Sequence, residues 1–215
     1  MDKILKEITD SPKFNFYLDE LLKIHSQEQT LRQHFYETVR EDQKAEYING
    51  EIILHSPVKY RHGIASDLLF SLIQSFVIKH RMGVVLHEKI MISLTRNDYE
   101  PDICFFKKET SDEFKPDQML FPAPDLIIEV TSPTTEKYDR GIKFSDYALH
   151  GVSEYWLVDP ENEIIEQYFL KGEEYELNIK SNSGIIKSKV IEGFEIPIRT
   201  AFDEQEYLKT MSNLI

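Results

Sequence analysis

A short apolar run that holds one charge is the feature that most constrains how this chain folds. Residues 126–130 read Leu-Ile-Ile-Glu-Val, and the continuous apolar centre is typical of a strand covered on both faces. Glu129 lies near the end of this run, where an unpaired buried charge costs several kcal/mol. The sequence therefore predicts a layered protein around a buried sheet, with a metal ion or a basic side chain beside Glu129.

The hydrophobic pattern predicts further helices and strands along the chain. Apolar residues recur at spacings of three and four over 61–82, which indicates an amphipathic helix that Gly83 ends. Asn49-Gly50 separates two short apolar runs and predicts a two-residue hairpin. Strands are also expected at 84–86, 90–92, 103–106, 154–158 and 164–170, a surface loop at 107–122, a helix of about 15 residues that closes at Gly151, and a short helix near 203–211. For 215 residues, this order predicts a mixed α/β fold in which helices flank a central sheet.

The chain divides into three parts. Residues 1–44 are polar and helical in pattern, with Leu31, Phe35 and Val39 at spacings of four. We interpret this segment as an N-terminal helical arm that packs on the core or on a second subunit. Residues 45–200 form the main domain, and residues 201–215 form a C-terminal helical tail.

Composition limits the classes of function. The net charge of −13 counts against broad binding of nucleic acid, which usually needs a basic face, although metal-binding carboxylates are themselves acidic. The single cysteine, Cys104, cannot form an internal disulfide or a thiolate zinc site, and we interpret Cys104 and His150 as structural. There is no apolar run of about 20 residues and no secretory signal, so we expect a cytoplasmic protein that does not contact a membrane.

Two acidic residues stand at the ends of predicted strands. Asp102 and Glu129 are 129 − 102 = 27 positions apart. If their strands are neighbours, about 4.8 Å apart, both carboxylates can bind one hard cation such as Mg²⁺, with Mn²⁺ able to substitute. Lys143 follows at the border of the next helix, from which an ammonium group can stabilise charge on a phosphate. The inward stripe of that helix is predicted to be Tyr138, Ile142, Ser145 and Leu149.

Each candidate residue also has an ordinary structural interpretation. Asp102 can cap a turn, and Lys143 can pair with Asp139 on a solvated helix face, for about 0.3 kcal/mol. His62 stands at a helix start, where phosphate binds, and is equally compatible with a surface histidine. Glu51 is either a further acid of the site or an exposed strand residue.

Four blocks of sequence resemble a known family. They are Tyr-Glu-Pro-Asp at 99–102, Asp-Leu-Ile-Ile-Glu-Val-Thr-Ser-Pro-Thr at 125–134, Asp-Arg-Gly-Ile-Lys at 139–143, and Gly-Val-Ser-Glu-Tyr-Trp-Leu-Val-Asp-Pro at 151–160. On these blocks the chain resembles the Uma-type "putative restriction endonuclease" family, which belongs to the PD-(D/E)XK nuclease superfamily. The similarity runs from about Tyr47 to Phe194.

The resemblance implies a restriction-endonuclease-like sheet and Mg²⁺-dependent cleavage of phosphodiester bonds, with DNA as the substrate. Asp102 matches the motif aspartate and Glu129 the second acid. The superfamily pattern has a lysine two positions after that acid, where this chain has Thr131. In this family the lysine is moved to the following helix, which corresponds to Lys143.

We therefore predict a DNA endonuclease in which Asp102, Glu129, Lys143 and His62 are catalytic and the two acids bind Mg²⁺. By analogy with nucleases that cut two strands, a homodimer joined through the arm is expected. Two alternatives stay open. One is a catalytically inactive nuclease fold that binds nucleic acid or protein, and the other is a nuclease that acts on RNA.

Overall fold

A six-stranded sheet forms the centre of the protein in the computed structural model, which describes residues 3–40 and 42–214. The order of its strands is β11-β10-β9-β8-β6-β3, and β8 and β9 run parallel while the other neighbours are antiparallel. All five residues of β8 are buried, as the apolar run predicts. The strands are β3 (Gly83–His87), β6 (Ile103–Lys107), β8 (Leu126–Val130), β9 (Glu154–Asp159), β10 (Ile164–Lys171) and β11 (Glu174–Ser181).

A second sheet lies beside the central one and carries the predicted hairpin. Its strand order is β2-β1-β5-β4-β7. Asn49 and Gly50 both have positive φ, 51° and 87°, which confirms the predicted two-residue turn. The strands are β1 (Ala45–Ile48), β2 (Glu51–Leu54), β4 (Met91–Ser93), β5 (Asp98–Tyr99) and β7 (Leu120–Phe121), and a separate two-stranded sheet pairs β12 (Ile185–Lys187) with β13 (Glu195–Pro197).

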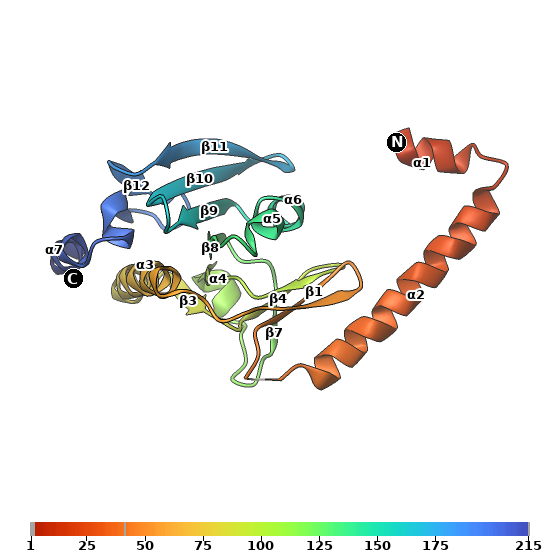
Figure 1. The fold of residues 1–215 in the computed structure, drawn as a ribbon, viewed down its shortest axis with the longest axis horizontal. Helices are drawn as coiled ribbons and strands as arrows, with labels where there is room; N and C mark the ends of the chain where they lie inside the picture. Colours follow the sequence, from red (N-terminus) through yellow and green to blue (C-terminus); the bar gives the residue numbers. More distant parts are fainter. Residues whose placement is uncertain (1–2, 41, 215) are drawn as a thin grey trace.

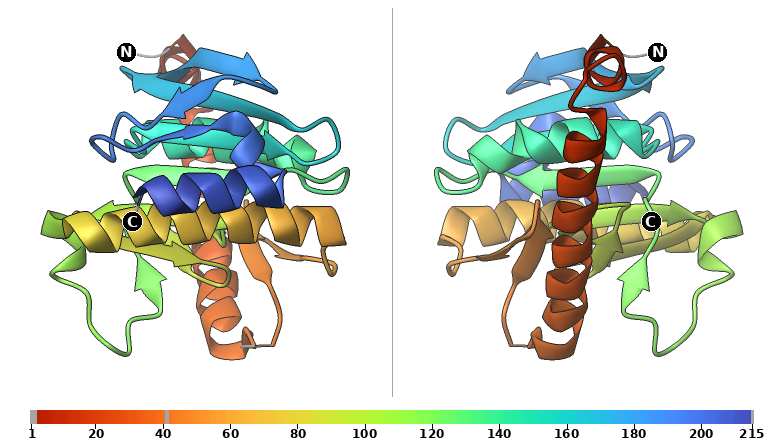
Figure 2. Two further views of the ribbon diagram at one scale, coloured as in Figure 1. Left: turned by 90° about the vertical axis from the view of Figure 1, so that its left-hand side faces the viewer. Right: turned by 90° about the vertical axis from the view of Figure 1, so that its right-hand side faces the viewer.

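Helices cover the two faces of the central sheet (Figures 1 and 2). On one face lie α3 (Tyr60–His80), the short 3-10 helix η1 (Ile198–Ala201) and α7 (Glu204–Leu214), and their apolar side chains form the larger core cluster. On the other face, α5 (Glu136–Asp139), α6 (Ile142–Leu149) and the second sheet enclose a further cluster. The predicted mixed α/β fold with flanking helices is confirmed.

The end of α3 differs from the prediction. The left-handed residue that ends the helix is Arg81, with φ of 56°, rather than a glycine. Gly83 instead begins β3, where a Cβ atom would lie 2.0 Å from the carbonyl oxygen of Phe106. Gly83 is therefore required for the close approach of β3 to β6.

The predicted helix after Thr134 is broken into two pieces. A Cβ atom on Gly141 would lie 2.6 Å from the carbonyl oxygen of Lys137, and the chain changes direction between α5 and α6 at this point. The predicted inward stripe is wrong as a consequence, since Ser145 and Leu149 are exposed. The buried face of α6 consists of Lys143, Tyr147 and Ala148.

Of two further segments, one differs from the prediction and one agrees with it. The predicted loop 107–122 contains the short helix α4 (Lys108–Ser111) and strand β7. The predicted helix near 203–211 is present as α7, which packs on α3 through a hydrogen bond between Ser71 and Tyr207.

The N-terminal arm is helical, and only part of it contacts the sheets. It consists of α1 (Lys3–Thr9) and the 25-residue α2 (Phe14–Thr38). Arg32 donates from Nε and an Nη atom to Asp98 of β5, at 2.7 Å in each case, and Phe35 is buried against Tyr47. Figure 1 shows α1 and the N-terminal half of α2 standing clear of the sheets. None of the described helices is long and apolar enough to cross a membrane.

Candidate active site

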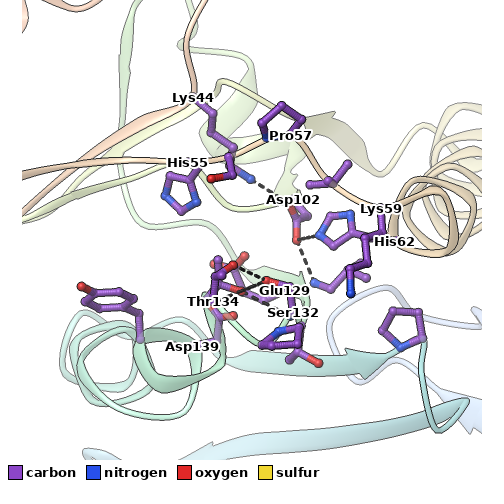
Figure 3. Close-up of a pocket in the computed structure, with 18 of the residues that line it drawn as sticks. Lys44, His55, Pro57, Lys59, His62, Asp102, Glu129, Ser132, Thr134 and Asp139 are labelled. Atoms are coloured by element: carbon purple, nitrogen blue, oxygen red, sulfur yellow. Dashed lines mark hydrogen bonds and ion pairs between the residues drawn. The ribbon is translucent and has the colours of Figure 1, made fainter.

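Strand pairing brings Asp102 and Glu129 together. Ile103 of β6 is paired with Ile128 of β8, so the antiparallel register places Asp102 opposite Glu129 one residue further along. Opposite residues on antiparallel strands point to the same face, with Cβ atoms about 5 Å apart. Both side chains are buried and line a pocket of about 280 Å³ (Figure 3). The pocket lies between the central sheet, the second sheet and the α5–α6 segment.

Lys143 reaches into this pocket from α6. Its Nζ atom lies 2.8 Å from Oε1 of Glu46, 3.1 Å from Oε1 of Glu129 and 3.3 Å from Oδ1 of Asp139. Burial disfavours the charged ammonium, but these carboxylates outweigh it and hold the pKa of Lys143 well above its ordinary value. Lys143 is therefore a buried cation in a carboxylate cluster, not the border residue that the helical pattern predicts.

Glu46 is the acid that the sequence pattern does not reveal. It lies on β1 and is fully buried. Its carboxylate accepts a hydrogen bond from the backbone N–H of Glu100 at 3.0 Å, and it pairs with Nε2 of His55 at 2.9 Å. Burial opposes ionisation, yet Lys143 and His55 lower the pKa of Glu46 to about 2. The sequence prediction weighed Glu51 instead, but that residue is exposed at the end of the hairpin and does not line the pocket.

Three donors surround the carboxylate of Asp102. Nζ of Lys44 donates to Oδ1 at 2.7 Å, the backbone N–H of Val130 donates to Oδ2 at 2.8 Å, and Nε2 of His62 lies 3.4 Å from Oδ2. Burial opposes the charge, but Lys44 and His62 hold the pKa of Asp102 well below its usual range. His62 thus lies at the predicted site, in the first turn of α3, and its Nδ1 is buried without a hydrogen-bond partner among the described residues. Lys44 was not predicted from the sequence.

Glu129 carries the opposite shift. Burial and the nearby carboxylates of Asp139 and Asp102 outweigh Lys143 and raise the pKa of Glu129 to about 8. The hydroxyl of Tyr147 donates to Oε1 of Glu129 at 3.0 Å. Burial also raises the pKa of Asp139. The four carboxylates of the cluster thus meet two ammonium groups, those of Lys44 and Lys143, and the raised pKa of Glu129 keeps its carboxyl largely protonated at neutral pH when no further cation is bound.

The donor set fits a small hard cation better than a soft one. Among the described residues, no three His, Cys, Asp or Glu side chains form a ready cage for a metal ion. Two carboxylates on adjacent strands are the usual protein contribution to Mg²⁺, which keeps several waters and also takes substrate phosphate oxygens. A divalent cation beside Asp102 and Glu129 would favour the ionised form of the Glu129 carboxyl, so the two acids fit such an ion.

The other residues considered in the sequence lie outside the pocket. Cys104 is buried, and burial raises the pKa of its thiol. Nδ1–H of His150 donates a hydrogen bond to the carbonyl oxygen of Asp146, at 2.8 Å, which fits the interpretation of a structural histidine.

Comparison with known proteins decides the family. The sequence model of the Uma2 family, described as "Putative restriction endonuclease", matches residues 28–199 of this chain. The chain belongs to the Uma2 family. An uncharacterized protein of Synechocystis sp., slr1290, is 31% identical to this Uma2 protein over 134 residues, which cover 60% of this chain and 67% of the relative.

A solved structure has the same fold. The crystal structure of a putative nuclease from Anabaena variabilis, assigned to DUF820, superposes with a TM-score of 0.68 at 20% identity. The match covers 80% of the Uma2 protein described here and 96% of the Anabaena chain. At this identity the comparison establishes the fold, and it supports the restriction-endonuclease-like architecture expected from the sequence.

Proposed function

We propose that this Uma2 protein is a Mg²⁺-dependent endonuclease that hydrolyses phosphodiester bonds in DNA. One observation carries the proposal: Asp102 and Glu129 stand opposite each other on adjacent strands in one pocket, with the ammonium group of Lys143 against Glu129. Membership of a family described as "Putative restriction endonuclease" supports the same reaction class.

In the proposed mechanism, each residue acts from the place described above. Asp102 and Glu129 would hold the metal ion. When bound, Mg²⁺ supplies Lewis-acid chemistry, because it polarises a phosphoryl oxygen and lowers the pKa of a coordinated water. Lys143 is kept charged by Glu46 and can stabilise the negative charge that develops on the phosphate, and a charge placed in advance is often the largest catalytic contribution.

The N-terminal turn of α3 supplies the phosphate contact in this proposal. His62 lies there beside Asp102, and Lys59 and Arg61 line the same pocket. Backbone N–H groups at a helix N-terminus favour anions. These basic side chains, of which Arg61 pairs with Glu161 at 3.2 Å, supply local phosphate contacts in a chain whose net charge is −13.

The test is cleavage by the purified full chain. Supercoiled plasmid, short single- and double-stranded DNA, and structured RNA are incubated with Mg²⁺ or Mn²⁺. Asp102→Asn and Glu129→Gln should each reduce DNA cleavage by about 10³-fold, because each removes a metal ligand and keeps the side-chain shape. Asp112→Asn is the matched control, since Asp112 is exposed and pairs only with Lys108 among the contacts described for it. Cleavage that is equal in all variants contradicts the proposal, and cleavage of RNA alone changes the substrate.

One observation favours a second candidate, a catalytically inactive module that binds nucleic acid or protein. Lys44 and Lys143 lie directly on Asp102 and Glu129, where permanent counter-ions would replace a metal ion. Calorimetric titration with Mn²⁺ separates the two. The nuclease proposal expects binding by the natural chain that Asp102→Asn weakens at least about 10-fold. Absence of binding favours the inactive module.

A further inference from the structure

Half of one long helix presents large apolar side chains to solvent. Of the twenty large hydrophobic residues that are exposed in the described part of the chain, eight lie on α2. Six of them form what we call the α2 stripe, and their exposed fractions range from 38% to 57%. The α2 stripe consists of Phe14, Tyr17, Leu18, Leu21, Leu22 and Ile24.

The α2 stripe lies on the same face of α2 that packs against the second sheet near the C-terminal end of the helix. Residues 18 positions apart complete five turns of 3.6 residues, so Phe14 and Tyr17 lie on the same side of α2 as Arg32 and Phe35. Arg32 and Phe35 are buried against the second sheet, whereas Phe14 and Tyr17 are each 38% exposed. Figure 1 shows that the domain does not reach this end of the helix, and Figure 2 shows α2 running along the side of the molecule. The face that the domain covers at one end is therefore uncovered at the other.

The spacing of the α2 stripe indicates another helix as its partner. Phe14 and Leu21 are seven positions apart, and so are Tyr17, Ile24 and Leu31. Two apolar positions repeated every seven residues form the seam along which two helices pair. At about 100 Å² exposed per side chain, the six residues present on the order of 600 Å², near the upper limit for a monomer and most of the ~800 Å² that each partner buries in a standard interface.

Charge identifies the partner as a second copy of this chain. Residues 3–38 contain five Lys and Arg and six Asp and Glu, which gives 5 − 6 = −1, while the whole chain carries −13. Two copies of so acidic a chain repel one another except where the local charge is close to zero. The stripe also lies outside residues 28–199, the part that the family model matches, so it is a feature of this chain beyond the family core.

We propose that the α2 stripe is an interface with the α2 helix of a second copy, so that this protein is a dimer joined by its N-terminal arms. The first test is the molar mass of the full chain, measured by light scattering after size exclusion. The natural chain should have a molar mass of twice 25.3 kDa, and the Leu21→Lys variant a molar mass of 25.3 kDa. The matched control is Leu177→Lys on β11, because Leu21 is 52% and Leu177 is 53% exposed and neither change should unfold the domain. The control should stay dimeric.

A second measurement locates the contact. Cys104 is fully buried, so a cysteine engineered on the surface is the accessible thiol of the described chain. Leu21→Cys should form a covalent dimer with a short bismaleimide cross-linker, and Leu177→Cys should not. The proposal is wrong if the natural chain is monomeric at all concentrations. Binding of that monomer to lipid vesicles would then identify a membrane surface as the partner of the α2 stripe. A Leu21→Lys variant that stays dimeric, or equal cross-linking at both positions, also overturns the proposal.

Discussion

The pocket and the α2 stripe break the same packing rule in opposite directions. The pocket buries ionisable groups, including Glu129 and Lys143, where apolar side chains would normally lie. The stripe exposes leucines and aromatic residues on the N-terminal half of a helix whose other half packs on the second sheet. A buried charge without compensation and a large exposed apolar patch are both unfavourable, and both are typical of surfaces that bind something. In this protein, the departures from ordinary packing indicate candidate binding surfaces more clearly than the well-packed core between them does.

The largest effect is expected from Lys143→Met, which tests whether the pocket charges depend on one another. The change leaves three buried carboxylates without their common cation and should reduce the free energy of unfolding by about 3–5 kcal/mol at pH 7. Chemical denaturation measures this value. Lys108→Met, on the exposed α4, is the control and should stay within about 0.5 kcal/mol. A stable Lys143→Met protein would show that the cluster is not held by this ammonium.

Glu46→Gln tests the same dependence between pocket charges at Glu46, the acid that the sequence pattern does not reveal. The shape is kept, but the closest partner of Lys143 loses its charge, so stability should fall by about 1–3 kcal/mol at neutral pH. The pKa of Glu46 is lowered to about 2, so its contribution is present above the ordinary value near 4.5 and is lost as pH falls toward 2. Glu51→Gln is the control, and it should match the natural chain in thermal melting at pH 7.

The pH dependence of stability should show the reverse sign at Glu129. Because the folded chain raises the pKa of this group to about 8, the folded state binds its proton more tightly than the unfolded state. Metal-free protein should therefore lose stability as pH rises from about 5 to about 8. Glu129→Gln should flatten the melting temperature over this range. If the melting temperature of Glu129→Gln depends on pH as steeply as that of the natural chain, the pH dependence does not come from Glu129.

The smallest expected effect on stability comes from the α2 stripe, and it appears only as a dependence of the melting temperature on protein concentration. A dimer melts at a temperature that rises with protein concentration, whereas a monomer does not. The natural chain should show this rise, and Leu21→Lys should not. At concentrations below the dissociation constant, the two should agree within about 0.5 kcal/mol, because Leu21 is exposed in the single chain.

The sequence predicts the contacts that follow from strand pairing or from a local turn. The opposition of Asp102 and Glu129 follows from two adjacent strands, and the Asn49-Gly50 turn follows from local backbone preference. The sequence does not predict a contact that depends on tertiary packing. Lys44 comes from the segment after α2 and meets Asp102 across 58 positions, a separation that no local pattern encodes.

The helix after Thr134 shows a subtler failure. The sequence correctly predicts Lys143 near Glu129, but the helical periodicity predicts that it lies at the border with solvent. The break at Gly141 changes which face of α6 turns inward, and the carboxylates of the sheet provide the polar interior that an inward lysine needs. Hydrophobic periodicity assumes an apolar interior and therefore misassigns a helix that packs on buried acids.

If the proposed metal ion binds at Asp102 and Glu129, the two lysines that lie on these acids separate folding from metal loading. Lys44 and Lys143 are covalently part of the chain, so the newly made protein carries its own counter-ions and does not wait for a divalent ion to reach its compact state. A chelator should consequently abolish the proposed nuclease activity while leaving the melting temperature nearly unchanged, unlike zinc-finger domains, which unfold when their metal is removed. Activity would then follow the supply of metal in the cell from minute to minute, with no need to make the protein again.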